Sequence, residues 1–199
     1  MGYPRSLNNL INSFKNLPGV GEKTAERMAL AMLDFDKSKL DSFATAIIDV
    51  KNKIKRCSIC NNLSENDKCD ICLDKSREHD VICVVEDVKN VILFEKNGLF
   101  NGQYHVLNGL ISPVDGIDPS DINVDALLER VEKEKIKEVI IAVKPSIEGE
   151  TTALYISKKL ENKDVIVSKI AHGIPMGADM EYIDAMTLET ALFERKKIS

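Results

Sequence analysis

Four cysteines in two close pairs constrain this chain more than any other feature of its sequence. The pairs are Cys57-Ser-Ile-Cys60 and Cys69-Asp-Ile-Cys72, with eight residues between them. Two C-x2-C pairs at such a separation are the ligand pattern of a closed, four-thiolate structural zinc site. A segment this short buries too little surface to fold alone, so a metal would supply its stability. We predict one structural Zn²⁺ per chain, bound by these four cysteines; ordinary cysteines or a redox pair are the alternatives.

The cysteine usage, the apolar runs and the first residues of the chain indicate the compartment in which the protein works. Five cysteines, four of them in metal spacing, fit a reducing cytosol better than a secreted disulfide scaffold. Cys83 stands in an apolar run and is expected to be a small buried hydrophobe. No apolar run reaches the roughly eighteen residues of a membrane span, and Met1-Gly-Tyr-Pro-Arg lacks the apolar segment of a signal peptide. We therefore expect a cytoplasmic protein without membrane contact.

The charge of the chain is divided unequally. The net charge of −5 argues at first against nucleic acid as a partner. Residues 1–56, however, carry ten Lys and Arg against six Asp and Glu, and the acidic excess lies in residues 57–199. A basic head on an acidic body permits a local nucleic-acid surface, although it does not establish one.

The basic head has helical periodicity interrupted by a glycine turn. Apolar residues recur at helical spacing in three stripes: Leu7, Leu10, Ile11 and Phe14, with Ser6 as N-cap; Ala25, Met28, Ala29 and Met32; and Leu40, Phe43, Ala44 and Ile47. Leu17-Pro-Gly-Val-Gly21 cannot continue a helix and must form a turn between the first two. We predict three helices, the first two joined by a hairpin.

That turn resembles the hairpin of a helix-hairpin-helix motif. Gly19 and Gly21 would let the backbone approach a phosphate, and the N–H groups that begin the next helix would face the anion. Lys23 lies at that helix start, and Arg27 follows one turn later on the same face. Such contacts are indifferent to base sequence. A plain helical packing unit is the alternative; a Walker A loop is rejected because Glu22 interrupts the required Gly-Lys-Ser/Thr.

Beyond the cysteines the pattern changes to an α/β one. Apolar, β-branched runs typical of buried strands occupy residues 81–85, 104–107, 138–143 and 164–170, and helical patterns occupy 87–96, 124–135 and 151–162. Strands that alternate with helices predict a parallel sheet with helices on both faces. Residues 112–121 should form a loop, and residues 184–197 a final helix.

Three glutamates follow two of these strands. Glu86 ends the first buried strand, and Glu148 and Glu150 follow the strand that ends at Val143. Side chains just past the carboxyl ends of parallel strands line the ligand crevice, where converging carboxylates could hold Mg²⁺. The arrangement resembles the Toprim domain, with the usual Asp-x-Asp replaced by Glu148-x-Glu150. The alternative role for Glu148 and Glu150 is to complement the dipole of a helix N-terminus.

The last segment, after the final strand, combines a Gly/Pro loop with acidic residues. Residues 172–182 read His-Gly-Ile-Pro-Met-Gly-Ala-Asp-Met-Glu-Tyr and look slightly like a Walker B element, which without a Walker A partner should not hydrolyse ATP. His172 could act as a general base or phosphate contact, with a loop-stabilising role as the favoured alternative. His79 and His105 are taken as structural.

Taken in order, these parts resemble the RecR family of bacterial recombination mediators. The resemblance covers essentially the whole chain and is carried by the hairpin, the four cysteines, and the segments 84–86, 104–109, 112–117, 148–153 and 170–175. Two departures are visible: Lys144-Pro-Ser146 stands where the family usually has Asn-Pro-Thr, and Ala178 where it often has Gly. The resemblance implies a helix-hairpin-helix head at 1–56, a zinc finger at 57–72, a Toprim domain at 80–175 and a C-terminal tail at 176–199.

The resemblance also implies a role. Members of this family act with RecO, and in other settings RecF, to load RecA onto single-stranded DNA, and they form dimers and ring-like tetramers that can embrace DNA. On this chain, Lys23 and Arg27 would face single- or double-stranded DNA, and the face with Glu86, Glu148 and Glu150 would meet RecO, RecF or a metal. We expect a non-enzymatic mediator near the nucleoid. A Mg²⁺-dependent Toprim nuclease is the competing hypothesis, weakened by the missing Asp-x-Asp and nucleophile.

Overall fold

The protein divides into two compact units, one that ends at Ile54 and one that begins at Lys55. The computed structural model describes residues 2–171, 173–195 and 197. Within these ranges, no helix combines the length and apolar character needed to cross a membrane. The two units are described in turn.

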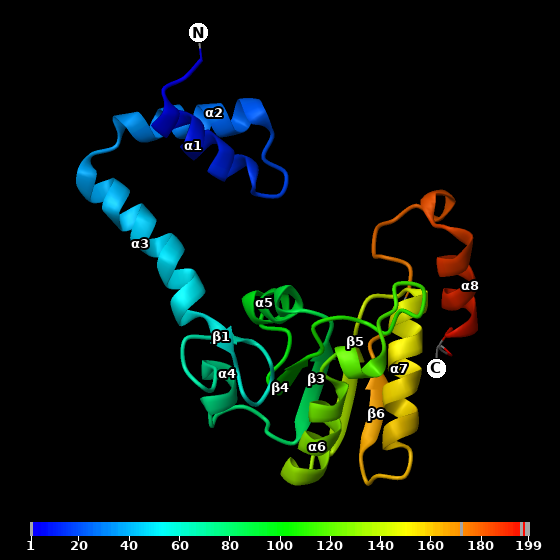
Figure 1. The fold of residues 1–199 in the computed structure, drawn as a ribbon. Helices are drawn as coiled ribbons and strands as arrows, with labels where there is room; N and C mark the ends of the chain where they lie inside the picture. The colour runs from blue at the N-terminus through cyan, green and yellow to red at the C-terminus, as the bar shows by residue number, and fades with distance from the viewer. Residues whose placement is uncertain (1, 172, 196, 198–199) are drawn as a thin grey trace. The chain divides into compact units, whose positions relative to one another are not determined.

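The first unit consists of helices, as predicted (Figure 1). Helix α1 spans Arg5–Lys15, α2 Glu22–Ala31 and α3 Lys37–Lys53, with a short 3-10 turn η1 at Met32–Asp34. The small core between α1 and α2 consists of Ile11, Phe14, Ala25 and Ala29. The apolar stripes of the first two helices therefore face each other, as their spacing predicts.

The start of α1 differs from the prediction. Ser6 was expected to be the N-cap, but Pro4 occupies that position, and its carbonyl accepts a 3.0 Å hydrogen bond from the N–H of Asn8. The ring of Pro4 fixes its φ angle close to the helical value. Helical hydrogen bonding therefore begins before Ser6. Ser6 lies inside the first turn.

The second unit opens with the cysteine segment. Strands β1 (Lys55–Arg56) and β2 (Leu63–Ser64) form a short antiparallel hairpin, and the one-turn helix α4 (Asp70–Leu73) follows. The hairpin carries the first cysteine pair in its loop, and the second pair lies at the start of α4, with Cys69 just before the helix and Cys72 within it. We call residues 55–73 the zinc knot.

The rest of the unit is built on a four-stranded parallel sheet, as the alternating pattern predicts. The strands are β3 (Val81–Val85), β4 (Gln103–Val106), β5 (Glu138–Ala142) and β6 (Ile166–Lys169), in the order β4-β3-β5-β6. All three pairings are parallel. Strand β3 is central and nearly wholly buried, which explains its continuous run of β-branched residues.

Helices cover both faces of this sheet (Figure 1). Helix α5 (Val88–Lys96) packs Val91 against Val85 and Tyr104 on one face. Helices α6 (Val124–Glu134) and α7 (Ile147–Leu160) cover the other face, where the larger core includes Leu127 and Ile156. The segment between β4 and α6 is mostly loop, as expected, and contains the 3-10 turn η2 (Pro119–Asp121).

Helix α7 begins earlier than the sequence predicts, and this changes the setting of two candidate residues. Its expected start was Thr151, but the helix starts at Ile147, since the hydroxyl of Ser146 accepts a 3.2 Å hydrogen bond from the N–H of Gly149 and caps it. Glu148 and Glu150 therefore belong to the first helical turn rather than to a loop.

The C-terminal segment contains a short turn and one helix beside α7 (Figure 1). The turn η3 spans Met180–Tyr182, and α8 spans Ala185–Phe193. The carboxylate of Asp184 caps α8 by accepting a hydrogen bond of 2.9 Å from the N–H of Thr187. The helix ends several residues before the predicted limit at residue 197.

Candidate metal centre, phosphate-binding hairpin and acidic crevice

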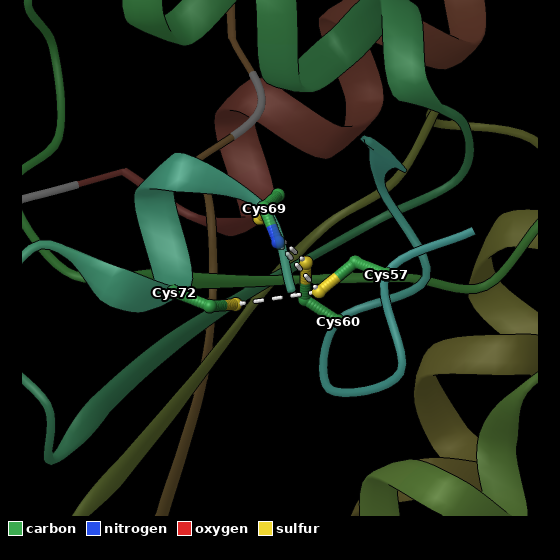
Figure 2. A group of neighbouring side chains, drawn as sticks. All are labelled: Cys57, Cys60, Cys69 and Cys72. Atoms are coloured by element: carbon green, nitrogen blue, oxygen red, sulfur yellow. Dashed lines mark hydrogen bonds between the residues drawn. The ribbon is translucent and has the colours of Figure 1, made fainter. Parts of the chain in front are cut away.

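The four predicted zinc ligands converge on one point (Figure 2). Their sulfur atoms all lie within 4.8 Å of one another, with three of the cysteines buried and Cys72 partly so. Sγ of Cys60 lies 3.5 Å from Sγ of Cys69, and Sγ of Cys57 lies 3.9 Å from Sγ of Cys72. Tetrahedral zinc with Zn–S bonds of about 2.3 Å separates its sulfurs by about 3.8 Å. The donor set therefore fits one structural Zn²⁺ with no coordination position left open.

Local backbone geometry explains how the two pairs come together. After Cys57, the chain turns at Asn61, whose φ of 61° is left-handed, and the N–H of Asn61 donates to the carbonyl of Cys57 at 3.0 Å. The second pair straddles the start of α4, where Cys69 is the N-cap. The N–H of Cys69 donates to Sγ of Cys57 at 3.3 Å, the kind of contact that stabilises a thiolate.

Contacts between the sulfurs also shift the pKa values of Cys60 and Cys69 in opposite directions. The hydrogen bond from Cys60 holds the pKa of Cys69 far below its ordinary value, while the contact with Cys69, together with burial, raises the pKa of Cys60 to about 12. Four thiols crowded in a buried site thus compete for protons, and a divalent cation that replaces those protons relieves the conflict.

Side chains outside the cysteine pairs attach the zinc knot to the sheet. The amide of Asn61 donates to the carbonyl of Val106 at 3.0 Å, and Nη2 of Arg56 donates to Oδ1 of Asn108 at 2.7 Å. These two contacts with the sheet were not predicted from the sequence. The left-handed Asn61 and Asn108 give a weak signal after the fact, because asparagine is enriched where φ is positive.

The glycine hairpin leads into a helix start that no side chain caps. Gly19 adopts a φ of 77°, a conformation that favours glycine, and an added Cβ there would meet open space. Gly21 is the N-cap of α2, and no side chain caps the helix in its place. The first N–H groups of α2 therefore lie at an exposed helix start and can donate to a phosphate.

Two exposed cations follow that helix start. Lys23 and Arg27 both lie on the solvent side of α2, one turn apart. Among the described residues, neither forms an ion pair, whereas the neighbouring Glu22 is paired with Lys15 at 3.4 Å. Lys15 thus compensates the negative charge of Glu22 beside the hairpin, which favours contact with an anion.

The three crevice glutamates are not brought together. Among described residues, the only group of three or more potential metal ligands within 4.8 Å is the four cysteines. The glutamates instead have separate partners. Glu86 faces Lys144 at 3.6 Å, Glu150 faces Lys169 at 2.9 Å, and Glu148 accepts a 2.6 Å hydrogen bond from the hydroxyl of Ser146.

The tail adds little to this crevice within the described residues. His172, for which a general-base, phosphate-contact or loop-stabilising role was considered, lies outside them. A cavity of about 890 Å³ separates the start of α7 from α8, and Glu150, Lys169 and Glu194 all line it. The tail thus contributes one carboxylate to the cavity that Glu150 lines, from Glu194 at the C-cap of α8.

Comparison with known protein families matches four successive parts of the chain. Residues 7–51 match the family described as RecR, helix-hairpin-helix, and residues 54–74 match the four-cysteine zinc finger domain of RecR. Residues 80–171 match the Toprim domain, and residues 173–196 match RecR, C-terminal. The zinc-finger match and the convergent sulfurs together establish the structural zinc site.

Whole-length relatives agree with these matches. The chain is 46% identical over 198 residues to the recombination protein RecR of Staphylococcus aureus, with 100% of both chains covered. It is 45% identical over 196 residues to the recombination protein RecR of Natranaerobius thermophilus, with 98% of both chains covered. A similar protein from Staphylococcus haemolyticus is 46% identical, with 100% of both chains covered.

Proposed function

Because the chain belongs to the RecR family of recombination proteins, we propose that it is a non-enzymatic mediator of recombinational DNA repair. In this role it binds DNA without sequence specificity and, with RecO and in some settings RecF, promotes loading of RecA onto single-stranded DNA. Its proposed place of action is the cytoplasm, at the nucleoid. The family's shared name supports the recombination role, and the hairpin supports the DNA contact.

The glycine hairpin is the observation that carries the proposal. Gly19 and Gly21 leave the start of α2 open, and Lys23 and Arg27 add two exposed positive charges beside it. N–H donors and cations in this arrangement recognise phosphate groups and not bases. DNA of any sequence, single- or double-stranded, presents phosphates at regular intervals to such donors.

Binding measured across a salt series tests this interface. We expect wild-type affinity for a single-stranded oligonucleotide to fall steeply as salt rises, because bound cations release counterions from DNA. The double variant Lys23→Ala, Arg27→Ala removes two contacts per chain and should flatten the logarithmic salt slope by about 1.4 for each bound chain. Zinc content should stay at one per chain.

A matched double variant separates this local effect from general loss of charge. Lys89 and Lys158 are exposed on helices of the second unit, and replacing both with alanine removes the same charge. The control variant should bind DNA as the wild type does. Equal weakening by both double variants, or no weakening by the hairpin variant, would remove the hairpin from the proposal.

The exposed face of α3 supports self-association as a further part of the proposal. None of the residues in α3, all of which the structure describes, is buried. Large apolar side chains nevertheless recur along it, with Phe43 41%, Ile47 59% and Val50 64% exposed. An apolar stripe this long on one helix suits burial against another protein surface. We propose that a second copy covers it, in a dimer or a ring-like tetramer, where several basic heads could line one DNA-binding opening.

The Toprim face is proposed as the contact for the protein partners. Glu86, Glu148 and Glu150 lie at the carboxyl edge of the sheet, where Glu86 and Glu148 are half-buried and Glu150 is exposed. This face is the proposed docking surface for RecO or RecF. The four-part division of the chain at 1–56, 57–72, 80–175 and 176–199 is kept as part of the proposal, with DNA binding in the first part and partner binding in the third.

A further inference from the structure

Two lysines occupy the carboxyl edge of the sheet among its acidic residues. In the order of the sheet, β3, β5 and β6 are neighbours. Glu86 follows β3, Lys144 lies just beyond β5, and Lys169 ends β6. The topology therefore places one lysine beside Glu86 and another beside the first turn of α7. Acidic and basic groups alternate along the edge where a divalent cation would bind in an α/β sheet.

Each lysine is paired with one of the candidate metal ligands. Nζ of Lys144 lies 3.6 Å from Oε1 of Glu86. Nζ of Lys169 lies 2.9 Å and 3.1 Å from the two carboxylate oxygens of Glu150, so it engages both. Both carboxylate oxygens of Glu150, either of which could ligate a cation, thus already accept hydrogen bonds from an ammonium group.

The positive charge of Lys144 also affects Glu148, the third glutamate. The hydroxyl of Ser146 and the helix start hold the pKa of Glu148 below its ordinary value, and the positive charge of Lys144 contributes to the same effect. The ammonium of Lys144 therefore compensates the charge of Glu86 and of Glu148 together. A divalent cation shared by these two carboxylates would perform the same task, and it would be repelled by the ammonium.

We propose that Lys144 and Lys169 are built-in counter-ions that take the place of a divalent cation, so that the Toprim crevice of this chain works without Mg²⁺. The residues present do not fit a metal: their carboxylates are dispersed among separate partners, and two positive charges lie among them. This inference concerns the crevice alone and does not depend on the proposed DNA contact. It also removes the electrostatic basis for a metal-dependent nuclease in this unit.

Binding of Mn²⁺ to the zinc-loaded full chain tests the proposal, with the free ion measured by electron paramagnetic resonance. Wild-type protein should bind no Mn²⁺ at millimolar concentration. The double variant Lys144→Gln, Lys169→Gln removes the two ammonium groups beside the carboxylates and should gain affinity for Mn²⁺ by more than about tenfold. Adding Glu86→Gln and Glu150→Gln to that variant should abolish the gain.

A control replaces a lysine that pairs with an acid elsewhere. Lys137 pairs with Asp80 at 2.7 Å at the start of β5, away from the crevice edge, and Lys137→Gln should gain no Mn²⁺ site. Stoichiometric binding by the wild type that is lost in Glu86→Gln or Glu150→Gln would overturn the proposal. So would a double variant that stays unable to bind Mn²⁺, because the lysines would then not be what excludes the cation.

Discussion

The N–H of Val106 donates a 2.8 Å hydrogen bond to the carbonyl of Cys60. Val106 is the last residue of edge strand β4, and Cys60 is one of the four zinc ligands. The metal site is thus bonded directly to the end of an edge strand. A sheet edge leaves backbone donors unpaired, and the zinc knot satisfies one of them. The zinc ion therefore stabilises part of the sheet as well as its own loop.

Loss of zinc should loosen the end of β4. In Cys60→Ser the site lacks one thiolate, and we expect zinc content to fall and the Val106 amide to lose protection from hydrogen exchange by about tenfold or more. Exchange measured by mass spectrometry or NMR checks this. Cys83→Ala, which alters a buried cysteine outside the knot, should retain zinc and that protection. Unchanged exchange at Val106 in zinc-free protein would show that the knot does not support the strand.

Gly149 should not tolerate a side chain. A Cβ at this buried position would overlap the carbonyl oxygen of Lys144, which belongs to the backbone and cannot move aside cheaply. We expect Gly149→Ala to lower the free energy of unfolding by about 1–3 kcal/mol, as overpacking does. Urea denaturation measures the change. Ser157→Ala, on the exposed side of the same helix, should stay within about 0.5 kcal/mol of wild type. Equal stability of both variants would contradict the close approach.

Gly149 also explains a limit of the sequence analysis. The helical pattern in the sequence covers residues 151–162, so the helix was expected to begin at Thr151, after Gly149. In the folded chain the missing Cβ lets the first turn of α7 pack against the preceding backbone, and Ser146 caps it. Local propensity was overridden by a tertiary contact that no spacing rule contains.

The zinc site could be predicted from local sequence, whereas the acidic crevice depends on contacts between distant parts of the chain. The zinc ligands could be predicted because both pairs are local in sequence and the metal imposes their spacing. The crevice could not be predicted in full, because Glu86 and its partner Lys144 are far apart in the chain and meet only through the order of the strands. The carboxyl-edge rule placed the glutamates just beyond the strand ends, but the expected convergence of their carboxylates was wrong, and the rule gave no information about their counter-ions.

Buried His105 should make stability depend on pH. Its side chain is fully buried, Nε2 lies 2.7 Å from the carbonyl oxygen of Asn123, and Nδ1 has no partner among the described residues. Burial lowers its pKa to about 4, against about 6.5 in the unfolded chain. Between these values the unfolded state binds the proton and the folded state does not. Stability should therefore fall as pH drops through this window, by about 1.4 kcal/mol per pH unit.

Urea denaturation at several pH values between about 5.0 and 6.5 measures this slope, in a range where most carboxylates stay ionised. His105→Gln removes the titrating group, so its stability should be nearly independent of pH in that range, whatever its absolute value. His79→Gln is the matched control, because His79 is exposed and contacts the carbonyl of Asp74. A slope that persists in His105→Gln would assign the effect to another group.

A charge on the apolar face of α3 should break self-association. Leu40, Phe43, Ile47 and Val50 recur at helical spacing and all lie exposed. Ile47→Asp places a carboxylate in the middle of this stripe, where burial against a second copy would be costly. We expect the mass in solution, measured by light scattering, to fall to that of a smaller assembly while helix content and zinc stay unchanged. DNA binding should weaken with it, since fewer hairpins then act together.

Asn52→Asp provides the comparison on the same helix. Asn52 is exposed and lies outside the apolar stripe, so the variant adds the same charge without entering the proposed contact. It should keep the wild-type mass. If Ile47→Asp and the wild type have equal mass as oligomers, the contact between copies uses another surface. If the wild type is already a monomer at high protein concentration, the stripe has no second copy to cover it, and the ring is excluded.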